Sequence, residues 1–153
     1  TNTFVVTATG TAGTVQGNAG MRYDGSTLNV TGDTNVTGAF TAASKSFDIP
    51  HPTKDGFRLR YGVLEGPEHG VYVRGIATSK VIELPDYWTG LVHENSITIQ
   101  LTPIGLATLH YLVKIEDNKI YIDSETSIIN VSFFIQAERK DVEKVLIEYK
   151  EQN

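Results

Sequence analysis

The residues best suited to chemistry lie in the run 64–70, whose sequence is LEGPEHG. Glu65 and Glu68 are the kinds of residue that act as general acid and as base or nucleophile in glycoside hydrolysis. A glycine and a proline lie between them, however, and predict a tight turn that joins LRYGVL to VYVRG. In that turn Gly66 and Gly70 would supply unusual backbone angles. We therefore expect an architectural turn and no catalytic activity.

The four histidines suggest a metal site, because neutral imidazole is a common ligand. None of them has a recognised ligand spacing. His51 lies between two prolines, and on the axis of a trimer it would contribute three ligands without any motif. The alternative is an ordinary surface histidine beside a turn. We expect no cofactor, with His51 as a weak metal candidate.

Three arginines alternate with apolar residues along two predicted strands: Arg58, Arg60 and Arg74. One face of these strands would then be apolar and the other cationic. A planar guanidinium suits the recognition of acidic sugars or of lipopolysaccharide phosphate. The alternative is that the arginines form ion pairs with acidic residues, for which the candidates are Glu65, Glu68, Glu83 and Asp86.

The only tryptophan, Trp88, follows Tyr87 at the end of a predicted strand. An exposed Tyr-Trp pair would form a platform on which a sugar ring stacks. The alternative is a core residue or a wedge between subunits, which is typical of a single tryptophan in a small β domain. The candidate ligand-binding set is therefore Tyr87, Trp88, Arg58, Arg60 and Arg74.

The composition excludes several classes of function. The chain has 153 residues, a net charge of -5 and no basic run, so it lacks the electrostatic signature of a nucleic-acid-binding protein. It has no cysteine, which excludes disulfides and thiolate metal sites. No apolar stretch approaches the roughly 20 residues of a membrane-spanning helix. The sequence also begins in mid-pattern, as a fragment of a longer protein would.

The character of the chain changes near residue 45. Residues 1–44 are rich in glycine and threonine and carry three charged residues, Arg22, Asp24 and Asp33. Within them NVTG occurs at 29–32 and again at 35–38. The segment has strand-forming composition but too few large apolar residues for a core of its own, so copies of the chain would have to cover it. We expect a short intertwined trimeric β stalk, and a flexible linker is the alternative.

In this stalk three apolar side chains would face the shared axis: Val30, Val36 and Phe40.

Residues 45–153 have the pattern of an all-β head. Short or alternating apolar runs are separated by turn residues and predict strands within 57–61, 71–74, 81–84, 97–101, 109–115, 120–122, 128–135 and 145–149. Asp117 and Asn118 tolerate positive φ and lie between LVKIE and KIYID, which predicts a hairpin. The last run, VLIEY, also fits helical spacing, and we favour a strand. The expected head is a β-sandwich or jelly-roll-like domain.

Residues 46–105 contain SFDIPHP, LRYGVLEGPEHGVYVRG, IELPDYWTGLV and SITIQLTPIG. The sequence of these runs resembles the C-terminal head domain of tail-fibre and other virion structural proteins of large marine bacteriophages, T-even-like cyanophages among them. The upstream TLNVTGDTNVTGAFTA is similar to the stalk repeats that precede such heads, or that precede the endosialidase-type chaperone domain of other phage fibres.

The resemblance implies a trimeric fibre component on a virion or at a cell surface. We therefore expect a homotrimer whose distal head binds an envelope glycan on a host or prey cell. The alternative is a structural cap or trimerisation domain without a ligand of its own. We expect no nucleic-acid partner and no insertion into a membrane.

Overall fold

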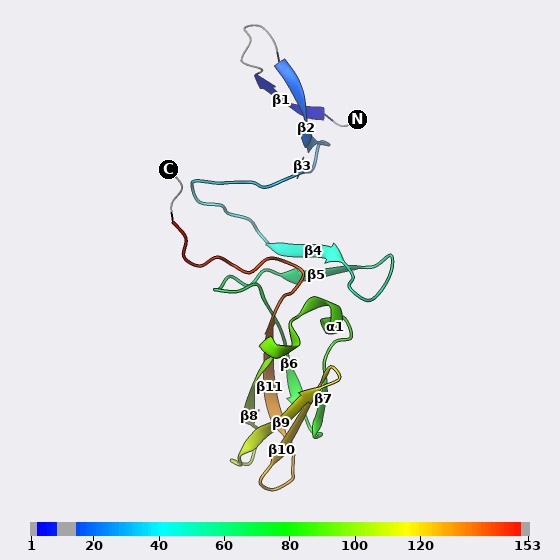
Figure 1. The fold of residues 1–153 in the computed structure, drawn as a ribbon, viewed down its shortest axis with the longest axis vertical. Helices are drawn as coiled ribbons and strands as arrows, with labels where there is room; N and C mark the ends of the chain where they lie inside the picture. The colour runs from blue at the N-terminus through cyan, green and yellow to red at the C-terminus, as the bar shows by residue number, and fades with distance from the viewer. Residues whose placement is uncertain (1–2, 9–14, 151–153) are drawn as a thin grey trace. The chain divides into compact units, whose positions relative to one another are not determined.

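The computed structural model describes residues 3–8 and 15–150, and its fold is all-β (Figure 1). The chain divides into two compact units, residues 1–43 and residues 44–153, one residue before the expected boundary. Each unit is built from small antiparallel sheets. No helix in the described part of the chain is long and apolar enough to cross a membrane.

The first unit contains one three-stranded antiparallel sheet in the order β1–β2–β3. Asp24 makes the turn between the last two strands, because its Oδ1 accepts the backbone N–H groups of Ser26 and Thr27 at 2.9 and 2.8 Å. Such side-chain to backbone bonds favour turns over regular structure. The strands are β1 (Thr3–Ala8), β2 (Val15–Tyr23) and β3 (Leu28–Val30).

The NVTG repeat is not covered within this unit. Its first copy contributes to β3, whereas residues 31–45 contain no strand. Val30, Val36 and Phe40 are exposed, Phe40 by 67%. An intertwined trimeric stalk therefore stays a prediction, and these side chains remain available to other chains.

The second unit contains two three-stranded antiparallel sheets, ordered β7–β10–β9 and β6–β11–β8, and a two-stranded sheet of β4 and β5. Two short helical turns connect β7 to β8. The bounds are β4 (Ser46–Pro50), β5 (Arg58–Gly62), β6 (Gly70–Ala77), β7 (Val81–Glu83), α1 (Trp88–Leu91), η1 (Glu94–Ser96), β8 (Thr98–Pro103), β9 (His110–Glu116), β10 (Lys119–Ser124) and β11 (Val131–Glu138).

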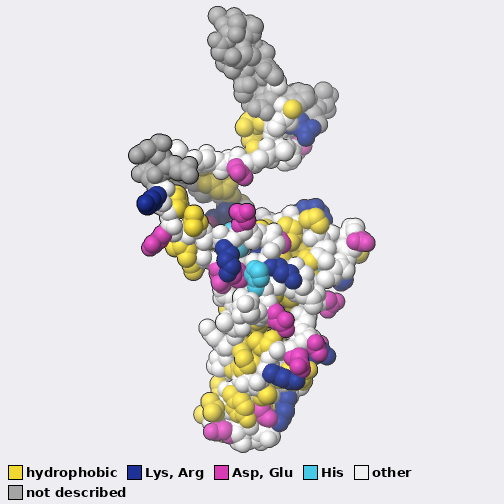
Figure 2. All heavy atoms as spheres, in the orientation of Figure 1, with side chains coloured by type: hydrophobic (Ala, Val, Ile, Leu, Met, Phe, Trp, Pro, Cys, Tyr) yellow, Lys and Arg dark blue, Asp and Glu magenta, His cyan; other side chains and the backbone are white. Residues whose placement is uncertain are grey.

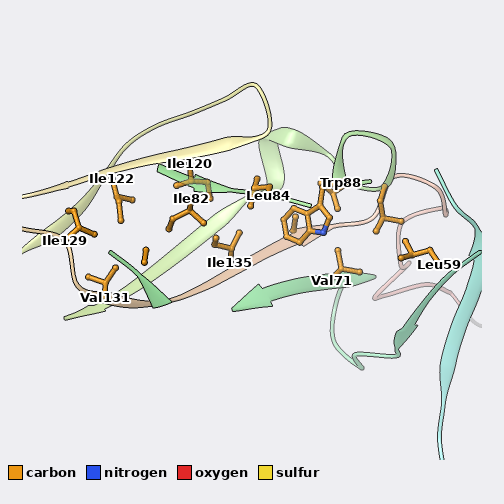
Figure 3. Close-up of a cluster of buried hydrophobic side chains, with 14 residues drawn as sticks. Leu59, Val71, Ile82, Leu84, Trp88, Ile120, Ile122, Ile129, Val131 and Ile135 are labelled. Carbon is orange, nitrogen blue, oxygen red and sulfur yellow. The ribbon is translucent and has the colours of Figure 1, made fainter. Parts of the chain in front are cut away.

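One apolar cluster fills the second unit (Figure 3). Ile82, Ile120 and Ile122 come from the β7–β10–β9 sheet, and Val71 and Ile135 come from β6 and β11. The cluster therefore joins the two three-stranded sheets, and burial of these side chains is the main source of stability available to a chain without disulfides.

Helix α1 adds the largest side chain to this cluster. Pro85 ends the preceding extended segment, and its carbonyl accepts the N–H of Trp88 at 2.9 Å. The helix lies close to the loop that follows β4. An added Cβ on Gly90 would lie 2.6 Å from the Cβ of Pro52, so only glycine fits at this contact.

Most of the predicted strands are present. Each strand predicted within 57–135 overlaps an observed strand. The apolar pattern did not predict β4. The predicted hairpin is confirmed. Asp117 and Asn118 join β9 to β10 with φ of 52° and 57°, the pair of positive angles that a tight type I′ turn requires.

Two predictions about the head are wrong. Residues 145–149 form no strand, because none of the residues that the structure describes pairs with them, and they are exposed. LRYGVL and VYVRG do not pair either, since β5 pairs with β4 and β6 with β11. Gly66 and Gly70 are not among the residues with positive φ, so the turn does not depend on glycine geometry.

Hydrophobic side chains also reach the surface of the second unit. Figure 2 shows them over the end of the unit that carries β9 and β10. The segment 102–113 contains no charged residue. Large exposed apolar patches mark interaction surfaces more often than inert ones. The exposed side chains here are Ile104, Leu106, Leu109, Tyr111, Leu112, Val113 and Ile128.

The contact between Gly90 and Pro52 gives a stability prediction. Gly90→Val should lower the free energy of unfolding by about 1–3 kcal/mol, because the added atoms must displace the loop at Pro52. Gly66→Val is the matched control, since nothing lies within 4 Å of its Cβ position, and should change stability by no more than about 0.5 kcal/mol. Urea unfolding measures both. Equal losses in the two variants would contradict the packing assigned to α1.

Candidate functional site

Two of the predicted ligand-binding arginines share one acidic partner. The β4–β5 register places Asp48 opposite Arg60. Arg60 Nε donates to Asp48 Oδ2 at 2.9 Å, and an Arg58 guanidinium nitrogen donates to the backbone oxygen of Asp48 at 2.8 Å. The Arg60 guanidinium, and next that of Arg58, hold the pKa of the Asp48 carboxyl below its ordinary value of 3.8. Asp48 is not one of the four acidic partners considered from the sequence.

The prediction of an exposed Tyr-Trp platform is wrong, because its tryptophan is buried. Trp88 is only 1% exposed and lies in the apolar cluster, so it cannot stack on an external sugar. Tyr87 is half-buried, and its hydroxyl lies 2.7 Å from that of Tyr61. Burial, together with this hydrogen bond, raises the pKa of Tyr87 above the ordinary value. Both side chains therefore pack in or against the apolar cluster of the head.

The two glutamates of the LEGPEHG run have different partners. Glu65 forms an ion pair with Lys45, whereas Glu68 accepts a hydrogen bond from Gln136 Nε2 at 2.8 Å. Glu68 thereby ties the turn to β11. Both glutamates therefore have a structural contact within the head.

The histidines do not form a metal site within one chain. Among the described residues, no three His, Asp or Glu side chains gather closely enough to hold a metal ion. The Nδ1 of His51 lies 3.3 Å from the backbone nitrogen of Thr53, and its ring meets that of Tyr87 edge-on at 5.5 Å between centroids. A site shared between copies stays a prediction.

A cavity of about 460 Å³ lies between α1, η1 and the β9–β10 turn. Several of its polar groups already hold the fold together. Asn118 Nδ2 donates to the carbonyls of Leu84 and Pro85, and Lys140 Nζ donates to the carbonyl of Thr89. The cavity is lined by Trp88, Thr89, Val92, His93, Glu94, Ile97, Asp117, Asn118 and Lys140.

The outer face of the β6–β11–β8 sheet is a candidate binding surface. The strand register arranges it in three rows, with β11 in the middle. The first row is Tyr72, Gln136 and Thr98, the second is Arg74, Phe134 and Gln100, and the third is Ile76, Ser132 and Thr102. We call these nine residues the outer face. The alternate residues of the same strands point to the core, as the period of two requires.

The outer face combines aromatic rings with uncharged polar groups. The rings of Tyr72 and Phe134 stack, with centroids 5.1 Å apart and planes 22° apart. Among the described residues, the side chains of Arg74 and Gln100 have no hydrogen-bond or ion-pair partner. An apolar ring surface beside free amide and guanidinium groups suits a ligand that has both a flat apolar side and hydroxyl groups.

Sequence reasoning identified only Arg74 of this surface. The alternation within VYVRGIA, SITIQLT and SFFIQA was readable, and it separates inward from outward residues. It does not show that β11 lies between β6 and β8, which are far apart in sequence. The stacked pair of Tyr72 and Phe134 exists only because of that pairing.

The comparisons with known proteins give no relative from which a role could be inferred. No protein-family model, no curated protein and no solved structure matches the chain. We therefore infer a function from the chemistry of the surface.

Acid stability tests the ion pairs of the head. The arginines lower the pKa of the Asp48 carboxyl. The contribution of the ionised carboxylate to folding stability is therefore fully present above pH 3.8 and is lost as the pH falls through the lower pKa of the folded state. Asp48→Asn should therefore flatten the loss of thermal stability below pH 3.8. Asp55→Asn is the control, because the Asp55 carboxylate has no hydrogen bond or ion pair among the described residues. An unchanged pH profile in Asp48→Asn would refute this role.

Proposed function

We propose that the chain is the distal part of a trimeric fibre on a virion or at a cell surface, and that its head binds an envelope glycan of a host or prey cell. In this proposal the two three-stranded sheets form a β-sandwich head, and the outer face is the binding surface. The observation that carries the proposal is the stacked Tyr72–Phe134 pair bordered by free polar groups.

The chemistry of the outer face favours a sugar over other ligands. Pyranose rings present an apolar face that stacks on aromatic side chains and hydroxyl groups that bond to amides. Arg74 is the only charged member of the nine, so neutral sugars fit the centre and an acidic group fits one edge. The net charge of -5 argues against a polyanion as the main ligand.

The trimer is supported by the apolar side chains that the first unit leaves uncovered. Val30, Val36 and Phe40 are exposed, and a segment with so few large apolar residues cannot bury them internally. Closed symmetric homo-oligomers are the common solution for such surfaces.

A structural cap is the competing proposal. In a cap the outer face would lie against a neighbouring copy, and the stacked rings would contribute to an interface core, where aromatic residues are also enriched. The two proposals differ in whether the outer face is accessible in the assembled protein.

The assembly can be tested by multi-angle light scattering. We expect a species of three times the 16.8 kDa chain mass. Val36→Asp should dissociate it, because three carboxylates would meet at the shared axis. Asn35→Asp adds the same charge at a neighbouring polar position and should leave the trimer intact. A monodisperse monomer at micromolar concentration would refute the trimeric fibre.

Binding can be tested on a glycan array with the trimeric parent. We expect a specific glycan signal that weakens roughly tenfold in Tyr72→Ala, because loss of an aromatic contact at the centre of a site costs more than about 1 kcal/mol. Phe57→Ala is the matched control, since Phe57 is an exposed aromatic residue outside the outer face. Thermal melting confirms that both variants remain folded.

The same variants separate the two proposals. If no glycan or cell envelope binds the parent, and Tyr72→Asp dissociates the trimer, the outer face is an interface between copies and the cap is correct. Glycan binding that persists undiminished in Tyr72→Ala would refute the site.

A further inference from the structure

The segment 145–149 has the composition of a strand but pairs with no strand in residues 3–8 and 15–150 of its own chain. The run VLIEY at 145–149 is rich in strand-forming residues, and Glu148 and Lys150 alternate outward, which is the pattern that predicted a strand. Ile147 is 68% exposed and Tyr149 76% exposed. Among the described residues, no backbone hydrogen bond involves residues 141–150.

The β4–β5 sheet has unpaired strand edges. It has only two strands, and no further strand in the described part of the chain pairs with either of them. The bonds from His51 N–H to the Phe57 carbonyl and from Val63 N–H to the Lys45 carbonyl show that odd-numbered residues face each other across it. Even-numbered residues therefore direct their backbone groups to the two outer edges.

The two outer edges are not equivalent. On β4 the outer edge includes Pro50, which has no N–H to donate. On β5 it presents the backbone N–H and C=O groups of Arg58, Arg60 and Gly62, and no strand in the described part of the chain pairs with them. The edge of β5 is thus the one open to a further strand.

Side-chain chemistry matches the segment to this edge. Leu59 and Tyr61 lie on the core side of β5, so an added strand could continue that face with Val145, Ile147 and Tyr149. Glu148 would then share the opposite face with Arg58 and Arg60. Among the described residues, Asp48 is the one acidic partner of both arginines, which leaves one positive charge that Glu148 can balance.

The residues that precede this segment, 139–144, lie at the same end of the head as the β4–β5 sheet. The Arg139 guanidinium lies 3.8 Å from the centre of the Phe47 ring of β4, and Lys144 forms an ion pair with Glu138 at 2.7 Å. In a trimer of parallel chains, each segment therefore starts at the level of its neighbours' β4–β5 sheets.

We infer that Val145–Tyr149 of one copy adds as a third strand to the outer edge of β5 in the neighbouring copy. The three exchanges close a ring, which is the heterologous arrangement that threefold symmetry allows. The occupant of the edge is a second copy of this chain. The inference builds on the trimer of the proposed function and names contacts that hold it together.

Cysteine cross-linking tests this inference directly, because the natural chain contains no cysteine. In the register that places Glu148 directly opposite Arg60, Arg60→Cys and Glu148→Cys, combined in one chain, should form a disulfide between copies on mild oxidation, because directly opposite residues on adjacent strands lie within disulfide range. The product should include covalent trimers. Co-expression of the two single variants should give a covalent species of twice the chain mass.

Arg74→Cys with Glu148→Cys is the matched control, because Arg74 is an exposed arginine on a different sheet, and it should not cross-link. A disulfide within a single chain would overturn the inference, since the segment would then fold onto its own β5. A protein that is trimeric by light scattering but forms no Arg60→Cys to Glu148→Cys disulfide would overturn the strand exchange and leave the fibre proposal standing. A monomer without cross-links would overturn both.

Discussion

Burial of Trp88 is the interaction on which the rest of the head depends. The indole lies among Val71, Leu84 and Ile135 (Figure 3), where removal of a side chain of this size would cost about 3–5 kcal/mol. Its helix is tied to the end of β11, because Lys140 N–H donates to the Leu91 carbonyl and His93 N–H to the Glu138 carbonyl. One side chain therefore anchors the connection between β7 and β8 and keeps the neighbouring strands in place.

Packing and ion pairs within the head occupy four of the five side chains that the sequence suggested for ligand binding. Trp88 and Tyr87 are used inside the head, and Arg58 and Arg60 are held by Asp48 at the β4–β5 hairpin. The surface that we propose for a ligand is the outer face, which faces away from the cluster because the residues of each strand alternate. Its aromatic centre and single arginine make it different in character from the cationic site that the sequence suggested.

Local features of the fold were predictable and long-range ones were not. Asp117 and Asn118 predicted their turn because positive φ is a property of two adjacent residues. The pairing of Arg60 with Asp48 depends on the β4–β5 register, and the stacking of Tyr72 on Phe134 depends on β6 lying next to β11. Neither relation can be read from spacing. The wrong prediction of a strand at residues 145–149 is different, because the local pattern is typical of a strand and the described part of the chain offers it no partner strand.

We propose that other copies complete the strand-forming segments that the described part of this chain leaves uncovered. Hydrogen–deuterium exchange on the assembled protein, read by mass spectrometry, tests this proposal most directly. We expect the amides in 145–149 and in the NVTG repeats to exchange slowly in a trimer, and this protection to be lost when the trimer is dissociated. Exchange of both segments at the rate of an unstructured peptide, in a sample that light scattering shows to be trimeric, would contradict it.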